Sequence, residues 1–433
     1  MELSQYIDVL NKLGAIIYDS KFQGLVYSVG GCERDRLLGY EIKDIDLVVN
    51  LPDGGIRLAK WLYKNEYLVH APVIYENYGT AMFRLSSCPD IELEAVQTRK
   101  ESYRDMTTRN PETAYGTIQE DCMRRDFTMN ALYRSVGTDE LHDFTGRSLK
   151  DIDDKIIRSC DNPDIIFKED SLRILRAIRF SCKLGWEIEH TTYLGMEKNV
   201  DRLGIISQER ITDEFNKILS FKDPSKGLLE IWKIGAMKYV SSYLANISFE
   251  DFLDAVNSMK WMTIEGKPLD RLAVLMMKVD DPEWAMREMK YSVNVIKYVM
   301  MLIREVPVIQ GLGDTFDKIK KSDVRKLQYR IGDSRWLINA IGIAHSINNK
   351  SCVSSRKNMQ AMHVLAMCIK LLNNSEDCFG YKLPVDGIDV MEVKKIGPGK
   401  EVKKYLDYLL EQAFENPHIT REECLDLIKK AEL

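Results

Sequence analysis

The sequence lacks the cysteine and histidine spacings that mark metal sites or disulfide frameworks. Its nine cysteines form no C-x-x-C pair and its six histidines no H-E-x-x-H motif. It also lacks an apolar run of about eighteen residues, and its start has neither the basic stretch nor the small-residue cleavage site of a signal peptide. We therefore expect no transition-metal centre and no membrane span, and we predict a cytoplasmic protein.

An excess of charge of one sign is absent too. The chain has 61 Lys and Arg against 66 Asp and Glu, a formal net charge of -5, which argues against coating nucleic acid by charge alone. One positive face could still meet a partner that carries phosphates. With 433 residues, 45% of them hydrophobic and 29% charged, the chain should form several packed units with ordinary cores.

The apolar patterns divide the chain into two kinds of structure. The first nineteen residues repeat apolar side chains at helical spacing, so a helix should come first. Short β-rich runs between turn-forming residues follow from Leu25 to Val136, which predicts a mixed sheet. After about Ile165 apolar side chains recur every three or four residues, which is the spacing of helices. The expected fold class is α+β, with a mixed-sheet head before an all-helical remainder, and Gly137 to Gly146 is one expected joint.

The strongest chemical signal is the segment from Val29 to Val49, VGGCERDRLLGYEIKDIDLVV. A strand that ends in Gly30 and Gly31 lets backbone amides approach a triphosphate, because no Cβ obstructs it, and the next helix adds its positive N-terminus. Arg34 lies one turn into that helix, where it could reach a phosphate.

Asp44 and Asp46 stand two residues apart at the start of an apolar strand. The two-residue period of a strand directs both carboxylates to one face, where they could hold magnesium ions. Two such ions would activate a hydroxyl and stabilise leaving pyrophosphate. Alone, the glycine pair predicts a simple turn and the aspartate pair a solvated strand end. Together, within twenty residues, they favour nucleotidyl transfer.

Two further segments carry weaker signals. In IELEAV, Glu92 and Glu94 share a strand face. Glu94 is the preferred candidate for a third carboxylate near the metals, and an exposed strand face is an equally good interpretation. RRDFTMNAL, from Arg124 to Leu132, offers forked donors for phosphate oxygens. Basic residues at a helix edge are usually just solvated, so this segment gains weight only from its neighbours.

The third cluster, FKEDSLRILRAIRF, spans Phe167 to Phe180 and predicts one helix with an apolar inner face. Charged residues recur every three positions along it: Asp170, Arg173, Arg176 and Arg179. A three-residue step winds slowly round a helix, so neighbouring members can cooperate although all four cannot face one ligand equally. For this helix taken alone, the residues favour ordinary ion pairs on a solvated face.

These segments, in this order, resemble the class II tRNA nucleotidyltransferase and bacterial poly(A) polymerase family. The similarity covers most of Leu25 to Leu219 and runs through GGCERD, KDIDLVV, YGTAMFRL, IELEAVQTRKESY, RRDFTMNAL, HDFTGRSLKDIDDKIIR, EDSLRILRAIRF and ISQERITDEFNKIL. It implies that Asp44 and Asp46 are catalytic and bind Mg²⁺, with Glu94 as a candidate third ligand. The implied nucleotide-binding residues are Gly30, Gly31, Arg34, Arg125, Asp126, Asn130, Asp170, Arg173, Arg176 and Arg179. Within this set, Asp170 and Arg173 would read the incoming base.

The chain departs from the family pattern at few positions. Cys32 and Glu33 stand where alanine and a branched apolar residue are usual, Met129 replaces isoleucine, and Ser171 replaces a common proline. None of these changes removes a reactive group. Glu33 does add an acidic side chain beside the expected triphosphate loop.

The resemblance also implies an architecture. A DNA polymerase β-like nucleotidyltransferase head would span residues 1–140, a helical neck with the nucleotide-selecting helix 141–225, a helical body 226–350, and a helical tRNA-binding tail 351–433. It further implies addition of CCA to the 3′ end of tRNA from CTP and ATP, with the tRNA acceptor arm as partner and no obligate protein partner.

Two segments favour full CCA addition over its alternatives. Arg99 to Thr117 resembles the flexible loop of enzymes that add the terminal A, and Pro384 to Ala413 resembles a tRNA-binding tail. Poly(A) polymerases of the family typically end in a basic extension, whereas this chain ends KKAEL. The alternatives are a poly(A) polymerase, an enzyme that adds only CC or only A, and an inactive RNA-binding adaptor. The intact carboxylate pair argues against an adaptor.

Overall fold

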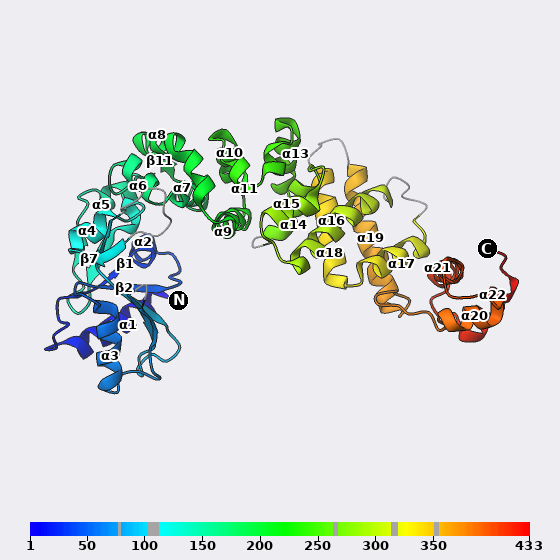
Figure 1. The fold of residues 1–433 in the computed structure, drawn as a ribbon, viewed down its shortest axis with the longest axis horizontal. Coiled ribbons are helices and arrows are strands. Elements are labelled where there is room, and N and C mark those ends of the chain that lie inside the picture. Colours follow the sequence, from blue (N-terminus) through cyan, green and yellow to red (C-terminus); the bar gives the residue numbers. More distant parts are fainter. Residues whose placement is uncertain (77–78, 103–111, 263–266, 313–318, 350–354) are drawn as a thin grey trace. The chain divides into compact units, whose positions relative to one another are not determined.

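The structure, a computed structural model, describes residues 1–433 apart from 77–78, 103–111, 263–266, 313–318 and 350–354 (Figure 1). The chain packs as two compact units, Met1–Phe215 with Leu229–Tyr239, and Asn216–Leu228 with Val240–Leu433. The division into head, neck, body and tail stays a prediction. Within the described ranges no helix is both long and apolar enough to cross a membrane.

A mixed sheet forms the centre of the first unit (Figure 1). It has seven strands in the order β3-β4-β5-β2-β1-β8-β9. The strands are β1 (Val26–Val29), β2 (Ile45–Val49), β3 (Val73–Tyr75), β4 (Thr80–Phe83), β5 (Leu93–Gln97), β8 (Leu132–Ser135) and β9 (Leu141–Asp143). The pair β2 and β5 is parallel and the other neighbours are antiparallel, so the prediction of a mixed sheet is confirmed. The expected joint from Gly137 to Gly146 contains β9, which pairs with β8, so the sheet continues through it.

Each face of this sheet contributes to a separate core. Because side chains alternate along a strand, Leu47 and Val49 join a core with α1 (Leu3–Ile17) and α3 (Gly54–Lys64), whereas Val48 joins a smaller one with Tyr133. Helix α3 packs closely on β5, since a Cβ at Gly55 would lie 2.2 Å from the carbonyl oxygen of Ala95. Only glycine allows that approach.

The first unit also contains helices and short strand pairs. The helices are α1, α2 (Gly31–Leu38), α3, α4 (Ile118–Met123), α5 (Ser148–Asp153), α6 (Pro163–Glu169), α7 (Leu172–Leu184) and α8 (His190–Asn199), with 3₁₀ turns η2 (Thr128–Asn130) and η3 (Val200–Ile205). Short pairs β6 (Arg99–Ser102) with β7 (Glu112–Tyr115), antiparallel, and β10 (Ile156–Ile157) with β11 (Glu187–Ile188), parallel, complete it. The central part of the loop predicted between Arg99 and Thr117 lies outside the described residues.

The prediction of one helix from Phe167 to Phe180 is wrong. Helix α6 ends at Glu169 and α7 begins at Leu172, because Asp170 between them is extended, with φ -142° and ψ 98°. The Asp170 carboxylate accepts the backbone N–H of Leu172 at 3.1 Å, a local hydrogen bond that competes with helical pairing. The inward packing of Leu172, Leu175 and Ile178 is confirmed, since all three are buried.

The second unit is helical throughout the part that the structure describes. Helices α9 (Gln208–Leu219), α10 (Ser225–Lys233) and α11 (Met237–Val240) cross the boundary between units. The others are α12 (Ser242–Ala245), α13 (Phe249–Met259), α14 (Pro268–Met276), α15 (Pro282–Glu288), α16 (Val293–Leu312), α17 (Lys321–Ile331), α18 (Ser334–Asn349), α19 (Ser355–Asn373), α20 (Gly387–Lys394), α21 (Lys400–Glu415) and α22 (Arg421–Lys430). The α+β class with a helical remainder is therefore confirmed.

A buried arginine and a separate small core organise this unit. Arg271 in α14 is fully buried and donates to the carbonyl groups of Leu219, Phe221 and Lys222, so it caps the C-terminal end of α9. Helices α20, α21 and α22 pack around a core of their own.

Candidate active site

A polar cavity of about 470 Å³ lies in the first unit, among strands β1, β2 and β5 and helices α7 and α9. Its charged lining consists of Asp46, Glu94, Asp126, Asp170, Arg99, Arg124, Arg125, Arg173, Arg176 and Arg210. The six guanidinium groups outnumber the four carboxylates. Such a lining can bind a triphosphate through the arginines and a hard divalent cation through carboxylate oxygens.

Two of these carboxylates come from adjacent parallel strands. Asp46 in β2 is the register partner of Glu94 in β5, and neighbouring strands lie only about 4.8 Å apart. Burial, followed by the charge of Glu94, raises the pKa of Asp46 to about 6, with Arg125 opposing and Asp44 adding to the effect. Although surrounding protein atoms desolvate the Asp46 carboxyl, Asp46 and Glu94 both keep solvent-exposed surface. Glu92, by contrast, pairs with Arg84 at 3.3 Å.

The second predicted ligand, Asp44, directly precedes β2 and does not line the cavity, although its charge acts on Asp46. Within the described ranges no group of three or more Asp, Glu, His or Cys side chains converges in a metal-binding arrangement. The carboxylates of Asp44, Asp46 and Glu94 are nevertheless chemically suited to Mg²⁺, since carboxylate oxygens are the ligands that this ion prefers.

The glycine turn before α2 lies next to Asp46. Gly30 has φ +88°, and a Cβ there would lie 3.5 Å from Asp46 Oδ2 and 3.8 Å from Arg125 Nη1. A residue with a side chain would therefore be strained and would also narrow the space between carboxylate and guanidinium. A Cβ at Gly31 would lie 3.4 Å from Arg34 Nη2. The turn keeps the start of α2 open beside the carboxylates.

A buried carboxylate orients two arginines of the cavity. Asp121 binds Arg124 Nη2 at 2.7 Å and Arg125 Nη2 at 3.2 Å, and it accepts the Tyr133 hydroxyl at 2.6 Å. Burial alone would raise the pKa of Asp121, but the two guanidinium groups outweigh it and hold the pKa at about 2. Arg125 also donates to the Tyr133 oxygen at 2.8 Å, so this arginine is held from two sides.

Asp126 and Asn130 link two further predicted residues. Asp126 Oδ2 accepts two hydrogen bonds from Arg176, at 3.0 and 2.7 Å, while its Oδ1 accepts from the Asn130 amide at 3.1 Å. Asn130 Oδ1 in turn accepts from Arg34 Nη1 at 2.6 Å. Arg34 is buried and also pairs with Asp35 at 2.7 Å. In this arrangement Arg34 and Asn130 support the cavity without lining it.

The predicted base-reading pair does line the cavity. Asp170 Oδ2 accepts from Arg210 Nη2 at 2.9 Å. Arg173 donates from Nη1 to the carbonyl of Ile166 and to Glu169, each at 3.3 Å. Arg179, the last member of the predicted series, binds Glu214 and is absent from the lining.

Sequence reasoning assigned no role to Arg210, although this residue lies in the segment ISQERITDEFNKIL that carries the resemblance. Arg99 was also given no role, whereas Arg124 belongs to the segment that was expected to offer donors to phosphate oxygens. All three arginines lie within the quoted segments, but the contact of Arg210 with Asp170 is visible only in the structure.

The unusual Glu33 is accommodated inside the first unit. Its side chain is fully buried, accepts hydroxyl hydrogens from Tyr6 and Ser28, and pairs with Arg134 at 2.7 Å. A buried carboxylate with three donors is well satisfied. Glu33 therefore holds α2 to α1, β1 and β8 and does not intrude on the cavity.

Two stretches of the chain match known protein families. Residues 26–158 match the poly A polymerase head domain, and residues 185–247 match a probable RNA- and SrmB-binding site of polymerase A. The chain is 24% identical to tRNA nucleotidyltransferase cca1 of Schizosaccharomyces pombe, over 99% of this chain and 95% of that one. It is 30% identical to the CCA-adding enzyme of Ligilactobacillus salivarius, over 63% of this chain and 65% of the relative.

Among solved structures, the CCA-adding enzyme of Bacillus stearothermophilus in complex with CTP superposes with a TM-score of 0.69 at 20% identity. The match covers 93% of this chain and 92% of that one. Fold and site together define a nucleotidyltransferase with a poly(A) polymerase head. More particularly, the chain belongs to the class II tRNA nucleotidyltransferase family of CCA-adding enzymes, and the resemblance seen in its sequence is confirmed.

Proposed function

We propose that this protein adds CCA to the 3′ end of tRNA from CTP and ATP and releases pyrophosphate. The observation that carries the proposal is the single cavity in which Asp46 and Glu94 meet six arginines and Asp170. Carboxylates for metal ions, guanidinium groups for phosphates and a further carboxylate for a base are the parts that nucleotidyl transfer needs. Relatives solved with CTP, with ATP and with tRNA support the choice of substrates.

Asp44 and Asp46 would hold Mg²⁺, with Glu94 as a candidate third ligand. When bound, the ion would supply charge stabilisation for the attacking and leaving oxygens. The repulsion between Asp46 and Glu94 supports this assignment, because a cation would relieve it. Gly30 keeps a Cβ out of the space beside Asp46.

The arginines would bind and orient the triphosphate. Arg125 is held by Asp121 and Tyr133, and Arg176 by Asp126, so their guanidinium planes are fixed before a nucleotide arrives. Preorganised donors cost little reorganisation during the reaction. Arg34, Asn130 and Arg179 would support this set from positions next to the lining residues.

Asp170 and Arg173 would choose the base without a nucleic-acid template. Cytosine and adenine each present an amino donor beside a ring-nitrogen acceptor, while uracil and guanine present the reverse pattern. A carboxylate only accepts and a guanidinium only donates. Asp170 would therefore accept the amino hydrogen and Arg173 would donate to the ring nitrogen, which matches C and A and mismatches U and G.

The helical remainder would hold the tRNA acceptor arm by shape and phosphate contacts, because the deep groove of A-form RNA shows little readable sequence. The cytoplasmic location stays a prediction, and one similar yeast enzyme is named as mitochondrial. A poly(A) polymerase of the same family is the alternative function.

The decisive experiment incubates the full chain with a tRNA that lacks CCA, MgCl₂, CTP and ATP, and sequences the products. Three added nucleotides, C, C and A, support the proposal. A long run of A would identify a poly(A) polymerase, and a product ending in CC would identify a partial enzyme. Binding of tRNA with no extension under any nucleotide mixture would identify an adaptor.

A further inference from the structure

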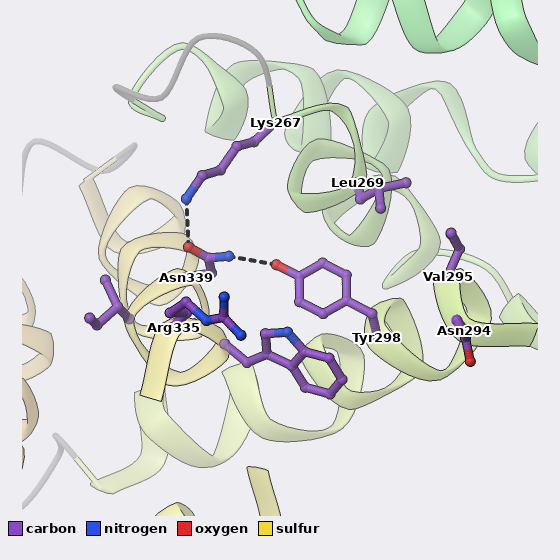
Figure 2. Close-up of a pocket in the computed structure, with 9 residues that line it drawn as sticks. Lys267, Leu269, Asn294, Val295, Tyr298, Arg335 and Asn339 are labelled. Atoms are coloured by element: carbon purple, nitrogen blue, oxygen red, sulfur yellow. Dashed lines mark hydrogen bonds between the residues drawn. The ribbon is translucent and has the colours of Figure 1, made fainter. Parts of the chain in front are cut away.

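A second cavity, of about 660 Å³, lies in the second unit among helices α14, α16 and α18 (Figure 2). It is lined by Lys267, Leu269, Asn294, Val295, Tyr298, Arg335, Trp336, Ile338 and Asn339. All of these residues follow the matched family segments, which end at residue 247. None of them belongs to the proposed active site.

Aromatic and aliphatic side chains form most of its wall. The rings of Tyr298 and Trp336 meet edge to face, with centroids 5.2 Å apart at 64°. Leu269, Val295 and Ile338 add aliphatic surface, and Ile338 is 55% exposed. Such a wall suits a flat ring, because a planar ligand gains both apolar contact and stacking from it.

The polar groups of this cavity form a directed chain of hydrogen bonds. Lys267 Nζ donates to Asn339 Oδ1 at 2.7 Å, and the Asn339 amide donates to the Tyr298 oxygen at 2.7 Å (Figure 2). Tyr298 in turn donates to buried Asp270. The oxygens of Asn339 and Tyr298 thus already accept hydrogen bonds. An ammonium has three N–H donors and an amide two, so Lys267 and Asn339 retain further donors.

Basic side chains lie along part of the same wall, and several of them pair with carboxylates. Arg335 and Lys267 both line the cavity, and Arg335 pairs through Nε and Nη2 with Asp333. Trp336 also lines an adjoining cavity of about 390 Å³, whose charged lining is Lys297, Arg304, Arg330, Arg287 and Glu283. Arg304 and Arg330 share one buried carboxylate, that of Glu305, so the basic side chains still outnumber the acidic ones. A ligand that joins a flat apolar ring to a group of hydrogen-bond acceptors with negative charge would match both the wall and its rim.

We propose that this cavity binds one nucleotide, with its base against Trp336 and its phosphate toward Lys267 and Arg335. The nucleotide could be free in solution or an unstacked residue of an RNA strand, since base stacking on an aromatic ring and phosphate contacts serve both. This site goes beyond CCA addition, because no step assigned to the active site uses it. A purely aliphatic ligand would leave the donors unsatisfied.

The test measures binding to the full chain without turnover, so it does not depend on whether CCA is added. Equilibrium dialysis gives the number of ATP molecules bound per chain, and filter binding gives the Kd for a tRNA that lacks CCA, with CTP and ATP omitted. The variants are Trp336→Leu, which removes the ring, Trp336→Phe, which keeps one, and Lys267→Met, which removes the charge. Trp284→Leu is the matched control, because Trp284 is 61% exposed and lines neither cavity.

Trp336→Leu and Lys267→Met should each weaken the same one of the two measured interactions, either ATP binding or tRNA binding. Trp336→Phe and Trp284→Leu should bind both ligands as the wild type does. Loss of one of two ATP equivalents would assign a free nucleotide. A rise of roughly tenfold in the Kd for tRNA, with ATP binding unchanged, would assign a nucleotide of the RNA strand. If Trp336→Leu and Lys267→Met both leave the number of ATP molecules per chain and the Kd for tRNA unchanged, the proposal is overturned. It is also overturned if the control Trp284→Leu weakens binding by the same amount.

Discussion

Asp170 and Arg210 form a 2.9 Å ion pair between residues forty positions apart, and both line the proposed active site. Asp170 uses its other oxygen to accept the backbone N–H of Leu172. The carboxylate that would read the base is thus held in one orientation by two donors. Arg210 is therefore expected to act on selectivity through Asp170.

Arg210→Met should lower the ratio of kcat/KM for CTP over UTP roughly twofold to fivefold. The ion pair is half exposed, so its loss should loosen Asp170 without removing it. The control is Arg84→Met, because the pair of Arg84 with Glu92 is similarly exposed and lies outside the cavity. An effect of equal size in both variants would contradict a positioning role for Arg210.

Replacing Asp44 and Asp46 with alanine should lower incorporation by roughly a thousandfold or more, since metal stabilisation of the transition state contributes several kcal/mol. The Kd for tRNA should change little, because these carboxylates would act on the metal and the nucleotide. Single-turnover extension and filter binding measure the two quantities. Substantial extension by the double variant would refute the metal assignment.

Asp121→Asn should destabilise the protein by about 2 kcal/mol at pH 7, because Arg124 and Arg125 hold the pKa of Asp121 at about 2. A carboxyl group with a lowered pKa stabilises the fold at pH values above its unfolded pKa, near 4. That contribution disappears as the pH falls toward 2. Urea unfolding should therefore show a gap between wild type and variant that narrows between pH 4 and pH 2. A constant gap would contradict the linkage.

The sequence predicted those parts of the site that depend on local patterns. Alternation in β2 and the glycine turn before α2 correctly indicated the strand with Asp46 and the open turn beside it. Helical spacing failed at Asp170, where a side-chain bond to Leu172 interrupts the helix. Spacing alone contains no information on such competition between side chain and backbone.

Long-range partners were beyond prediction from local patterns. The pairing of Asp46 with Glu94 depends on the register between β2 and β5, and that of Asp170 with Arg210 on the packing of α9. Buried Glu33 likewise finds Arg134 about a hundred residues away. Tertiary packing decides which charged side chains become neighbours. The sequence therefore predicted candidate residues but not their partners.

A chain that ends before Pro384 should need about tenfold more tRNA for half-maximal rate, if the tail contributes several phosphate contacts. CTP binding should survive, because every residue that lines the proposed active site, up to Arg210, lies well before Pro384. Helices α20 to α22 have their own core, but buried Arg325 donates to the carbonyl groups of Phe414 and Glu415 in α21. Circular dichroism must therefore show that the shortened chain keeps its remaining helices. Equal tRNA affinity in both chains would refute the role of the tail.

Asp170→Ala should lose both activity and selectivity. With the carboxylate gone, the amino group of cytosine loses its acceptor, and uracil no longer meets a repelling oxygen. An unpaired buried polar group costs on the order of 1 to 3 kcal/mol, so the ratio of kcat/KM for CTP over UTP should fall by about tenfold or more. The assay uses a tRNA that ends before the first C.

Asp164→Ala is the matched control for this measurement. Asp164 and Asp170 are equally exposed, at 26% of each side chain, and both pair with basic residues. Asp164 lies in α6 outside the cavity, so its loss could affect packing but not base reading. If Asp170→Ala lowers the rates for CTP and UTP by the same factor, as a purely structural change would, then Asp170 does not read the base. A selective loss for CTP in Asp170→Ala alone assigns the reading to this carboxylate.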